Sequence, residues 1–396
     1  MQFSQLTSRI AGEGTAAWDI HIQALQRRAQ GEEVTILSVG DPDFDTPTEI
    51  VGAAVNSLRN GHTHYPDMRG SLALREVIAE YHRNQGVKDI DPQNVIILHG
   101  AQNGLYAVAQ CLFNPGDEVI IPEPTYVTYE PAVRSTDAKI VRVPMNPDSD
   151  FRLDPKLIEA AITPRTRALM LNSPHNPTGQ LIGPETWKKI AALCKKHDIW
   201  LVSDEVYAEL IFEGEHLCPA RFEEIADRTV VISSLSKSHA MTGWRLGWVM
   251  GPRALIDHIF NLSLCMLYGC PSFLQDAAVE ALSKAHPELD VMKETYRNRR
   301  DTVCDTLSES RWLRAVRPPS GMFLMIDVRK TGLSSKAFSQ ALLDNYDVSV
   351  LPAEAFGPSG AGFVRLSLTV DTEQLREACR RMDACAREHS ITPVSA

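Results

Sequence analysis

Short, mostly apolar runs alternate with helical patterns through the middle of the chain. Each run is four or five residues long and rich in Val, Ile and Leu, as is typical of strands buried on both faces. Between several of them lie predicted helices, including Gly104–Leu112 and Pro184–His197. This alternation predicts a mainly parallel sheet with helices on both faces. The predicted strands are Val95–Leu98, Glu118–Ile121, Lys139–Val143, Ala168–Leu171, Trp200–Ser203, Val230–Ser233 and Leu246–Met250.

The pattern changes after about residue 290. A charged helical run, Glu294–Asp305, is followed by predicted strands at Gly321–Val328 and Ala361–Leu368, and by a helical pattern at Thr372–Arg387. We therefore expect an α/β protein with a large domain over residues 46–290. Residues 291–396 and the N-terminal segment 1–45 should form a smaller α+β domain, joined to the large one by a continuous helix.

Composition narrows the possible partners and the compartment. The 396 residues are 44% hydrophobic and carry 40 basic and 50 acidic side chains, a net charge of −10, which argues against a protein that binds duplex nucleic acid. No run of 18 apolar residues and no signal peptide is evident, so we expect no membrane partner and a cytoplasmic location. The eight cysteines form no CxxC pair, which indicates free thiols and no metal site.

A lysine directly after a predicted strand is the first sign of chemistry. Lys237 lies among Ser234 and Ser236, and Arg245 follows eight residues later. Ligands of open α/β sheets bind at the carboxyl ends of strands, so this set suits an anionic ligand beside a reactive amine. The sequence contains no GxxxxGK[ST], GxGxxG or GxSxG pattern, which argues against the common nucleotide-binding and hydrolase sites.

Two more predicted strands end in polar side chains. Asp204 and Tyr207 follow the strand that begins at Trp200, and Asn176 lies in a proline-bounded turn after the strand that begins at Ala168. Each alone is compatible with an ordinary strand end. Together with Lys237 they predict one site at the edge of the sheet.

These motifs resemble those of the class I aminotransferases, pyridoxal 5′-phosphate (PLP) enzymes of fold type I, and the resemblance runs from about Ser38 to Leu368. It implies a large domain with a mainly parallel seven-stranded sheet. Lys237 would be the Schiff-base lysine that also moves the substrate Cα proton. Asp204 would hold the pyridine nitrogen protonated, while Tyr207 and Asn176 would bond the 3-oxygen. Burial and the charge of Arg245 should favour the neutral form of the lysine.

The same resemblance implies how the rest of the cofactor is held. Ala101 and Gln102, at the start of a helix, would bind the phosphate together with Ser234, Ser236 and Arg245. Tyr126 would stack on the ring. Tyr65 would reach the phosphate of a neighbouring subunit, so the resemblance implies a homodimer with shared active sites.

The resemblance also implies which residues bind the substrate. Arg365 resembles the arginine that binds the substrate α-carboxylate, beside Gly40 and Asn176. Within the family, the stretches Ala16–His21 and Ser263–Gly269 are most similar to bacterial arginine–pyruvate transaminases. For a cationic donor, Trp18 and Asp19 are candidates for the side-chain pocket.

We therefore expect an enzyme that moves the α-amino group of an L-amino acid, arginine, to a 2-oxo acid, pyruvate, by a ping-pong mechanism. Three alternatives stay open. The first is an aminotransferase for neutral, aromatic or acidic amino acids. The second is a PLP lyase or oxidase on the same fold. The third is a non-catalytic regulator, which the complete set from Tyr65 to Arg365 disfavours.

Overall fold

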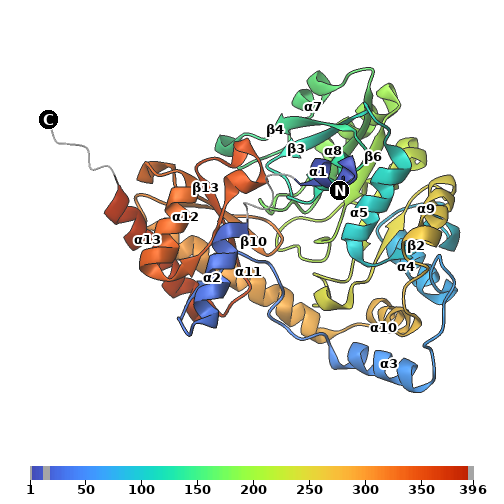
Figure 1. Ribbon diagram of the computed structural model, residues 1–396, viewed down its shortest axis with the longest axis horizontal. Coiled ribbons are helices and arrows are strands. Elements are labelled where there is room, and N and C mark those ends of the chain that lie inside the picture. Colours follow the sequence, from blue (N-terminus) through green and yellow to red (C-terminus); the bar gives the residue numbers. More distant parts are fainter. Residues whose placement is uncertain (1, 12–17, 391–396) are drawn as a thin grey trace.

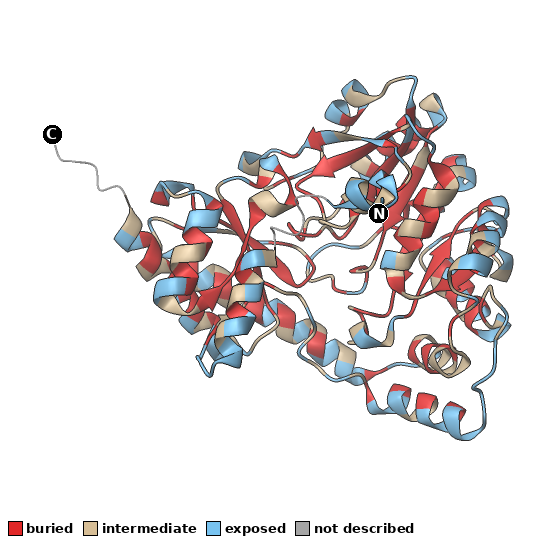
Figure 2. Ribbon diagram, viewed as in Figure 1, coloured by how far each residue is buried: buried red, intermediate tan, exposed pale blue. Residues whose placement is uncertain are grey.

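The computed structural model describes residues 2–11 and 18–390. Figure 1 shows a large part built around a wide sheet and a smaller part that contains the C-terminal helices. Most strands of both parts are buried (Figure 2). None of the helices within the described ranges is long and apolar enough to cross a lipid bilayer.

The large part contains a seven-stranded sheet in the order β2-β8-β7-β6-β5-β3-β4. All neighbouring strands are parallel except β8, which is antiparallel to both β2 and β7. The sheet positions the carboxyl ends of β5, β6 and β7 side by side. Its strands are β2 (Val95–Leu98), β3 (Glu118–Glu123), β4 (Lys139–Pro144), β5 (Thr166–Asn172), β6 (Trp200–Asp204), β7 (Thr229–Ser234) and β8 (Gly247–Met250).

Alternate residues of these strands pack against helices on opposite faces of the sheet. Ile96 and Leu98 belong to the cluster under α5, α6 and α9, whereas Val95 and Ile97 belong to the cluster under α3, α4 and α10. Helices α7 and α8 cover the remainder of the second face. The bounds are α3 (Thr48–Arg59), α4 (Leu72–Asn84), α5 (Gly100–Leu112), α6 (Tyr129–Arg134), α7 (Pro155–Ala161), α8 (Pro184–His197), α9 (Arg253–Met266) and α10 (Ser272–Ser283).

The smaller part has a four-stranded antiparallel sheet in the order β12-β13-β10-β9 and a parallel pair, β1 with β11. Helix α11 (Pro287–Ser308) leads from α10 into this part and packs on α13 (Figure 1). The other elements are α2 (Asp19–Ala29), β1 (Thr35–Ile36), β9 (Arg314–Val316), β10 (Phe323–Asp327), α12 (Ser335–Tyr346), β11 (Val348–Ser349), β12 (Leu351–Pro352), β13 (Phe363–Ser367) and α13 (Thr372–His389).

The predicted seven-stranded sheet is confirmed, and each predicted strand falls on an observed one. Helix α5 begins at Gly100, four residues before the predicted start. The first helix, α1 (Gln5–Ile10), packs on α6 of the large part, whereas α2 contacts α12 and β11. The N-terminal segment thus touches both parts of the molecule, and the division at residues 46 and 290 stays a prediction.

Candidate active site

A cavity of about 640 Å³ opens where β5, β6 and β7 end. The three strands deliver Asn172, Asp204 and Ser234 to its wall, because parallel strands place their carboxyl ends at the same edge. The cavity therefore lies where ligands of open α/β sheets bind. Its other lining residues are Ala101, Gln102, Leu105, Tyr126, Tyr129, Asn176, Val206, Tyr207, Ser236, Lys237, Thr242 and Arg245.

Lys237 lies on the turn after β7, and its amine points into this cavity. Its Nζ donates a hydrogen bond to the carbonyl oxygen of Gly40 at 2.8 Å. Burial, together with the positive charges of Arg365 and Arg245, lowers the pKa of Lys237 to about 8, against an opposing effect of Asp41. The prediction that burial and Arg245 favour the neutral amine is confirmed. Such an amine is a nucleophile and a base near neutral pH.

Asp204, at the end of β6, is almost fully buried. Its Oδ2 accepts a hydrogen bond from the Tyr129 hydroxyl at 2.6 Å, and Oδ1 accepts one from the backbone N–H of Val206 at 3.2 Å. Burial raises the pKa of Asp204 to about 6, and these two hydrogen bonds keep it from rising further. The carboxylate is thus ionised at neutral pH and suits a cationic partner.

Tyr129 also lines the cavity, a position that the sequence did not predict. Within the stretch Pro124–Tyr129, the resemblance implies a role for Tyr126 alone. The structure places the Tyr126 ring edge-on to that of Tyr129, with centroids 6.0 Å apart, and gives Tyr129 the contact to Asp204. The three-residue spacing was visible in the sequence, but the direction of each ring depends on how α6 packs.

A chain of hydrogen bonds connects Tyr207 to Arg365. Asn176 Nδ2 donates to the Tyr207 hydroxyl oxygen at 3.3 Å, and Arg365 Nη1 donates to Asn176 Oδ1 at 3.1 Å. Arg365 Nη2 donates to the carbonyl oxygen of Ser38 at 2.9 Å. The guanidinium lies over the ring of Phe323, 4.1 Å from its centroid.

Arg365 is buried, and its Nε has no hydrogen-bond partner within the described residues. Burial lowers its pKa to about 10, so the guanidinium stays charged at neutral pH. A buried cation held by neutral acceptors is costly unless an anion joins it. A carboxylate is the anion that its planar fork fits best.

The N-terminus of α5 forms the opposite end of the cavity. Gly100 has a φ of +78°, and a Cβ there would lie only 2.7 Å from Arg245 Nη2, so glycine lets the guanidinium approach the first turn. Arg245 Nη1 is held by the carbonyl oxygen of Thr242 at 2.7 Å. Ala101 and Gln102 in that turn, with Ser234 and Ser236 opposite, complete an anion-binding set.

Comparison with known proteins identifies the family. A family model described as "Aminotransferase class I and II" matches residues 32–382. The chain belongs to the class I and II aminotransferases. The arginine–pyruvate transaminase AruH of Pseudomonas aeruginosa is 57% identical, over 98% of this chain and 99% of that protein. The aspartate aminotransferase of Pyrococcus horikoshii is 36% identical, over 91% and 93% of the two chains.

Solved structures agree with this family. The aspartate aminotransferase from Thermus thermophilus with maleate is 34% identical and superposes with a TM-score of 0.92, over 97% of this chain and all of that one. The expected fold of an α/β aminotransferase with a seven-stranded sheet is confirmed. The chain is an aminotransferase, which decides against the non-catalytic alternative.

Enzymes of this family use PLP, and the cavity fits that group. Its two ends carry the chemistry that PLP requires: an anion-binding set at α5 for the phosphate, and a buried carboxylate, Asp204, for the pyridine nitrogen. Lys237 supplies an amine for the aldehyde, and the unsatisfied Arg365 suits the carboxylate of a substrate.

Three predicted site residues lie outside the cavity of this aminotransferase. Trp18 packs on the apolar cluster that contains Phe356, and Asp19 is exposed in the first turn of α2; neither lines the cavity. Tyr65 is 83% exposed, edge-on to Tyr268 with ring centroids 5.0 Å apart. Its predicted role belongs to a neighbouring subunit, so it stays a prediction.

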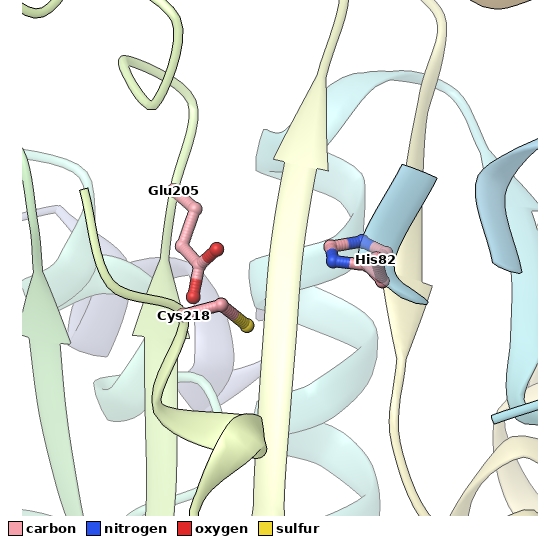
Figure 3. A group of neighbouring side chains, drawn as sticks. All are labelled: His82, Glu205 and Cys218. Atoms are coloured by element: carbon pink, nitrogen blue, oxygen red, sulfur yellow. The ribbon is translucent and has the colours of Figure 1, made fainter. Parts of the chain in front are cut away.

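A second group of polar side chains lies buried behind the Lys237 turn. Ligand-capable atoms of His82, Glu205 and Cys218 come within 4.8 Å of one another (Figure 3). His82 Nε2, however, accepts a hydrogen bond from Trp248 Nε1 at 3.1 Å, and His216 holds Glu205 Oε2 at 2.9 Å. Since a metal would have to displace these bonds, we interpret the group as a buried hydrogen-bond network.

Proposed function

We propose that this aminotransferase binds PLP through Lys237 and transfers the α-amino group of arginine to pyruvate in a ping-pong reaction. The observation that carries the proposal is the placement of a buried amine, a buried carboxylate and a buried guanidinium around one cavity. The 57% identity to an arginine–pyruvate transaminase, over almost the whole of both chains, supports the choice of substrates.

The side chains and backbone of the protein would each have a separate role in the reaction. Arg365 and the backbone at Ser38 and Gly40 orient the donor, with its carboxylate on the guanidinium and its Cα near Lys237. The lysine amine would take the proton from Cα of the donor in the first half-reaction and deliver a proton to Cα of the product amino acid in the second. When bound, the cofactor supplies an aldehyde that carries the amino group and a ring that withdraws electrons from the reacting carbon.

Asp204 has the task of holding a proton on the ring nitrogen. Its carboxylate is ionised at neutral pH and lies where water is excluded, so its charge acts strongly on a nearby cation. Tyr207 and Asn176 present a hydroxyl and an amide to the 3-oxygen side of the ring. Tyr126, partly buried beside Tyr129, would cover the ring face.

We also propose that the working unit is a homodimer with shared sites. Three apolar side chains spaced along one face of α3, Val51, Val55 and Leu58, are exposed, as are Tyr65 and Tyr268. Exposed aromatic and aliphatic groups of this kind are typical of surfaces that bind another protein. The proposal predicts that Tyr65 enters the cofactor site of the partner subunit.

The test is to supply purified holoenzyme with arginine and pyruvate and to measure alanine. We expect alanine and the 2-oxo acid of arginine in equal amounts. Ammonia release without alanine would mean a lyase or oxidase, and a strong preference for glutamate or aromatic donors would leave only the general aminotransferase activity.

The matched variant is Lys237→Ala. It removes the reactive amine, so we expect alanine formation to fall by at least about a thousandfold while the circular dichroism spectrum is kept. Near-normal turnover in this variant would contradict the assignment of the lysine.

A further inference from the structure

The segment from Ser38 to Asp41 contacts Lys237 and Thr242, which line the cavity. The carbonyl oxygen of Ser38 accepts from Arg365 at 2.9 Å, and that of Gly40 accepts from Lys237 at 2.8 Å. One residue further, Asp41 Oδ1 accepts from the hydroxyl of Thr242 at 2.6 Å. Thr242 lines the cavity. In order along the chain, the segment therefore contacts the guanidinium of Arg365 and the amine of Lys237, and then contributes an acidic side chain of its own.

Asp41 differs from the other carboxylate of the site. Asp204 is the one acidic side chain in the lining formed by the described residues, but it is buried and already bonded to Tyr129. Asp41 is solvent-exposed, and its negative charge is close enough to raise the pKa of Lys237 against the effect of burial. Its second oxygen is therefore available at the rim, where a long substrate side chain would emerge.

A donor amino acid fixed at its carboxylate and its amine has one substituent left to place. Arg365 and Lys237, which would hold the carboxylate and the amine, are bonded to Ser38 and Gly40, and Asp41 is the next residue of that segment. Lys237 and Arg245 in the lining, and Arg365 beside Asn176, are positive and would repel a cationic side chain, whereas the carboxylate of Asp204 is already bonded to Tyr129. Asp41 is the negative group on that segment.

We propose that Asp41 is the residue that selects a guanidinium side chain on the donor, resting on the proposed use of arginine. A carboxylate and a guanidinium form paired, charge-assisted hydrogen bonds. Because Asp41 is exposed, water screens the interaction, and its contribution to selectivity is moderate. The role predicted for Asp19 would then fall to Asp41.

The test compares Asp41→Asn with the wild-type holoenzyme on arginine, citrulline and alanine as donors. Asparagine keeps an oxygen that can accept from Thr242, so the variant removes the charge and spares the contact. Citrulline matches arginine in length but is neutral. We expect kcat/KM for arginine to fall about tenfold, as for the loss of one charge-assisted contact, while citrulline and alanine change less than about twofold.

Two further variants test whether the charge of Asp41 is the cause of the loss for arginine. Asp41→Glu keeps the charge and should retain a preference for arginine over citrulline. Asp45→Asn makes the same charge change on the same segment at another exposed position and should leave all three donors unaffected. Titrating arginine and citrulline into Lys237→Ala, with and without Asp41→Asn, should give the same discrimination without turnover.

The outcomes separate this inference from the proposed function. An equal loss for all three donors would make Asp41 a structural partner of Thr242 and overturn the inference, as would no loss for arginine. In both cases wild-type turnover of arginine would stand. If the wild-type enzyme makes no alanine from arginine but does from other donors, the proposed substrate and the role of Asp41 fail together.

Discussion

Three buried charged side chains, Lys237, Asp204 and Arg365, give the cavity its chemical character. Burial moves the pKa of each toward its neutral form, to about 8, about 6 and about 10. At neutral pH the carboxylate and the guanidinium keep their charges, whereas the lysine has an appreciable neutral fraction. One low-dielectric environment thus yields an anion, a cation and a reactive amine, because their ordinary pKa values differ.

The lowered pKa of Lys237 predicts how the apoprotein takes up PLP. Only the neutral amine attacks an aldehyde, so the rate of uptake should rise about tenfold per pH unit below pH 8 and level off above it. Stopped-flow absorbance at several pH values measures this profile. Since Asp41 raises this pKa, Asp41→Asn should shift the profile to lower pH. A rise that continues to pH 10 would contradict the shift caused by burial.

The hydrogen bond from Tyr129 to Asp204 leads to a second prediction for a single residue. Tyr129→Phe removes the 2.6 Å hydrogen bond to Asp204 and raises the pKa of that carboxyl further, so less of it is ionised. We expect kcat to fall about tenfold, in line with the cost of an unsatisfied buried carboxylate, and the acidic limb of the kcat profile to move to higher pH.

A matched control is Tyr81→Phe. Tyr81 also bonds a carboxylate at 2.6 Å, that of Glu209, but it does not line the active-site cavity. Loss of the Tyr81 hydroxyl should leave the pH dependence of kcat unchanged. An identical change in both variants would mean that Tyr129 acts only through stability.

At the scale of elements, the segment from Ser38 to Thr46 connects the two parts of the molecule. Arg365 and Arg299 of the smaller part bond Ser38 and Asp43, and Lys237 of the large part bonds Gly40. Thr46 bonds the carbonyl oxygen of Ala240 in the large part. The hydrophobic pattern alone does not predict this function of the segment, since it forms neither a helix nor a strand over these residues.

Gly40 shows how tightly this segment is packed. A Cβ at this position would lie 2.1 Å from Cζ of Phe323, the ring on which Arg365 stacks. Gly40→Ala should displace the ring and the guanidinium, and we expect kcat/KM to fall about tenfold or more for every donor, as overpacking of this kind costs 1–3 kcal/mol. Steady-state kinetics with arginine and alanine measure the loss.

The comparison variant is Gly52→Ala in α3, where a Cβ meets no atom within 4 Å. It should leave turnover unchanged and stabilise the helix by about 0.5–1 kcal/mol. Full activity of Gly40→Ala would show that the ring of Phe323 can move without disturbing Arg365.

On the scale of the whole molecule, elements from the N-terminal and the C-terminal parts of the chain meet in the smaller part. Strand β1 pairs with β11, and α11 runs from the large part into the packing with α13. The cavity lies on the large sheet, but Arg365 reaches it from β13. Movement of one part against the other would therefore change the distance between Arg365 and Lys237.

The proposed shared site predicts complementation between two defective subunits. Lys237→Ala lacks the amine, and Tyr65→Ala lacks the exposed phenol that would reach the partner's phosphate. A mixed dimer places the intact lysine of one subunit opposite the intact tyrosine of the other. We expect co-expressed variants to show more activity than the two homodimers assayed apart and added. Activity no greater than that sum would contradict the sharing of Tyr65.

The sequence by itself determined the sheet and identified most of the residues that line the cavity. Strands buried on both faces have continuous apolar runs, and the residues after them must lie at the sheet edge, which places Asp204, Asn176 and Lys237 together. The prediction of β8 as a strand is confirmed, but its apolar run does not indicate that it is antiparallel to β2 and β7.

Only the tertiary structure decided contacts between residues distant in sequence. Tyr129 and Asp204, which are hydrogen-bonded, lie 75 residues apart in the sequence, and Lys237 and Gly40 lie 197 residues apart. It also bonded Asp41 to Thr242, which lines the cavity, and left Asp19 exposed in the first turn of α2, although both are acidic residues of the N-terminal segment. Periodicity specifies which face of an element is buried; the side chain that meets a given atom depends on how the elements pack.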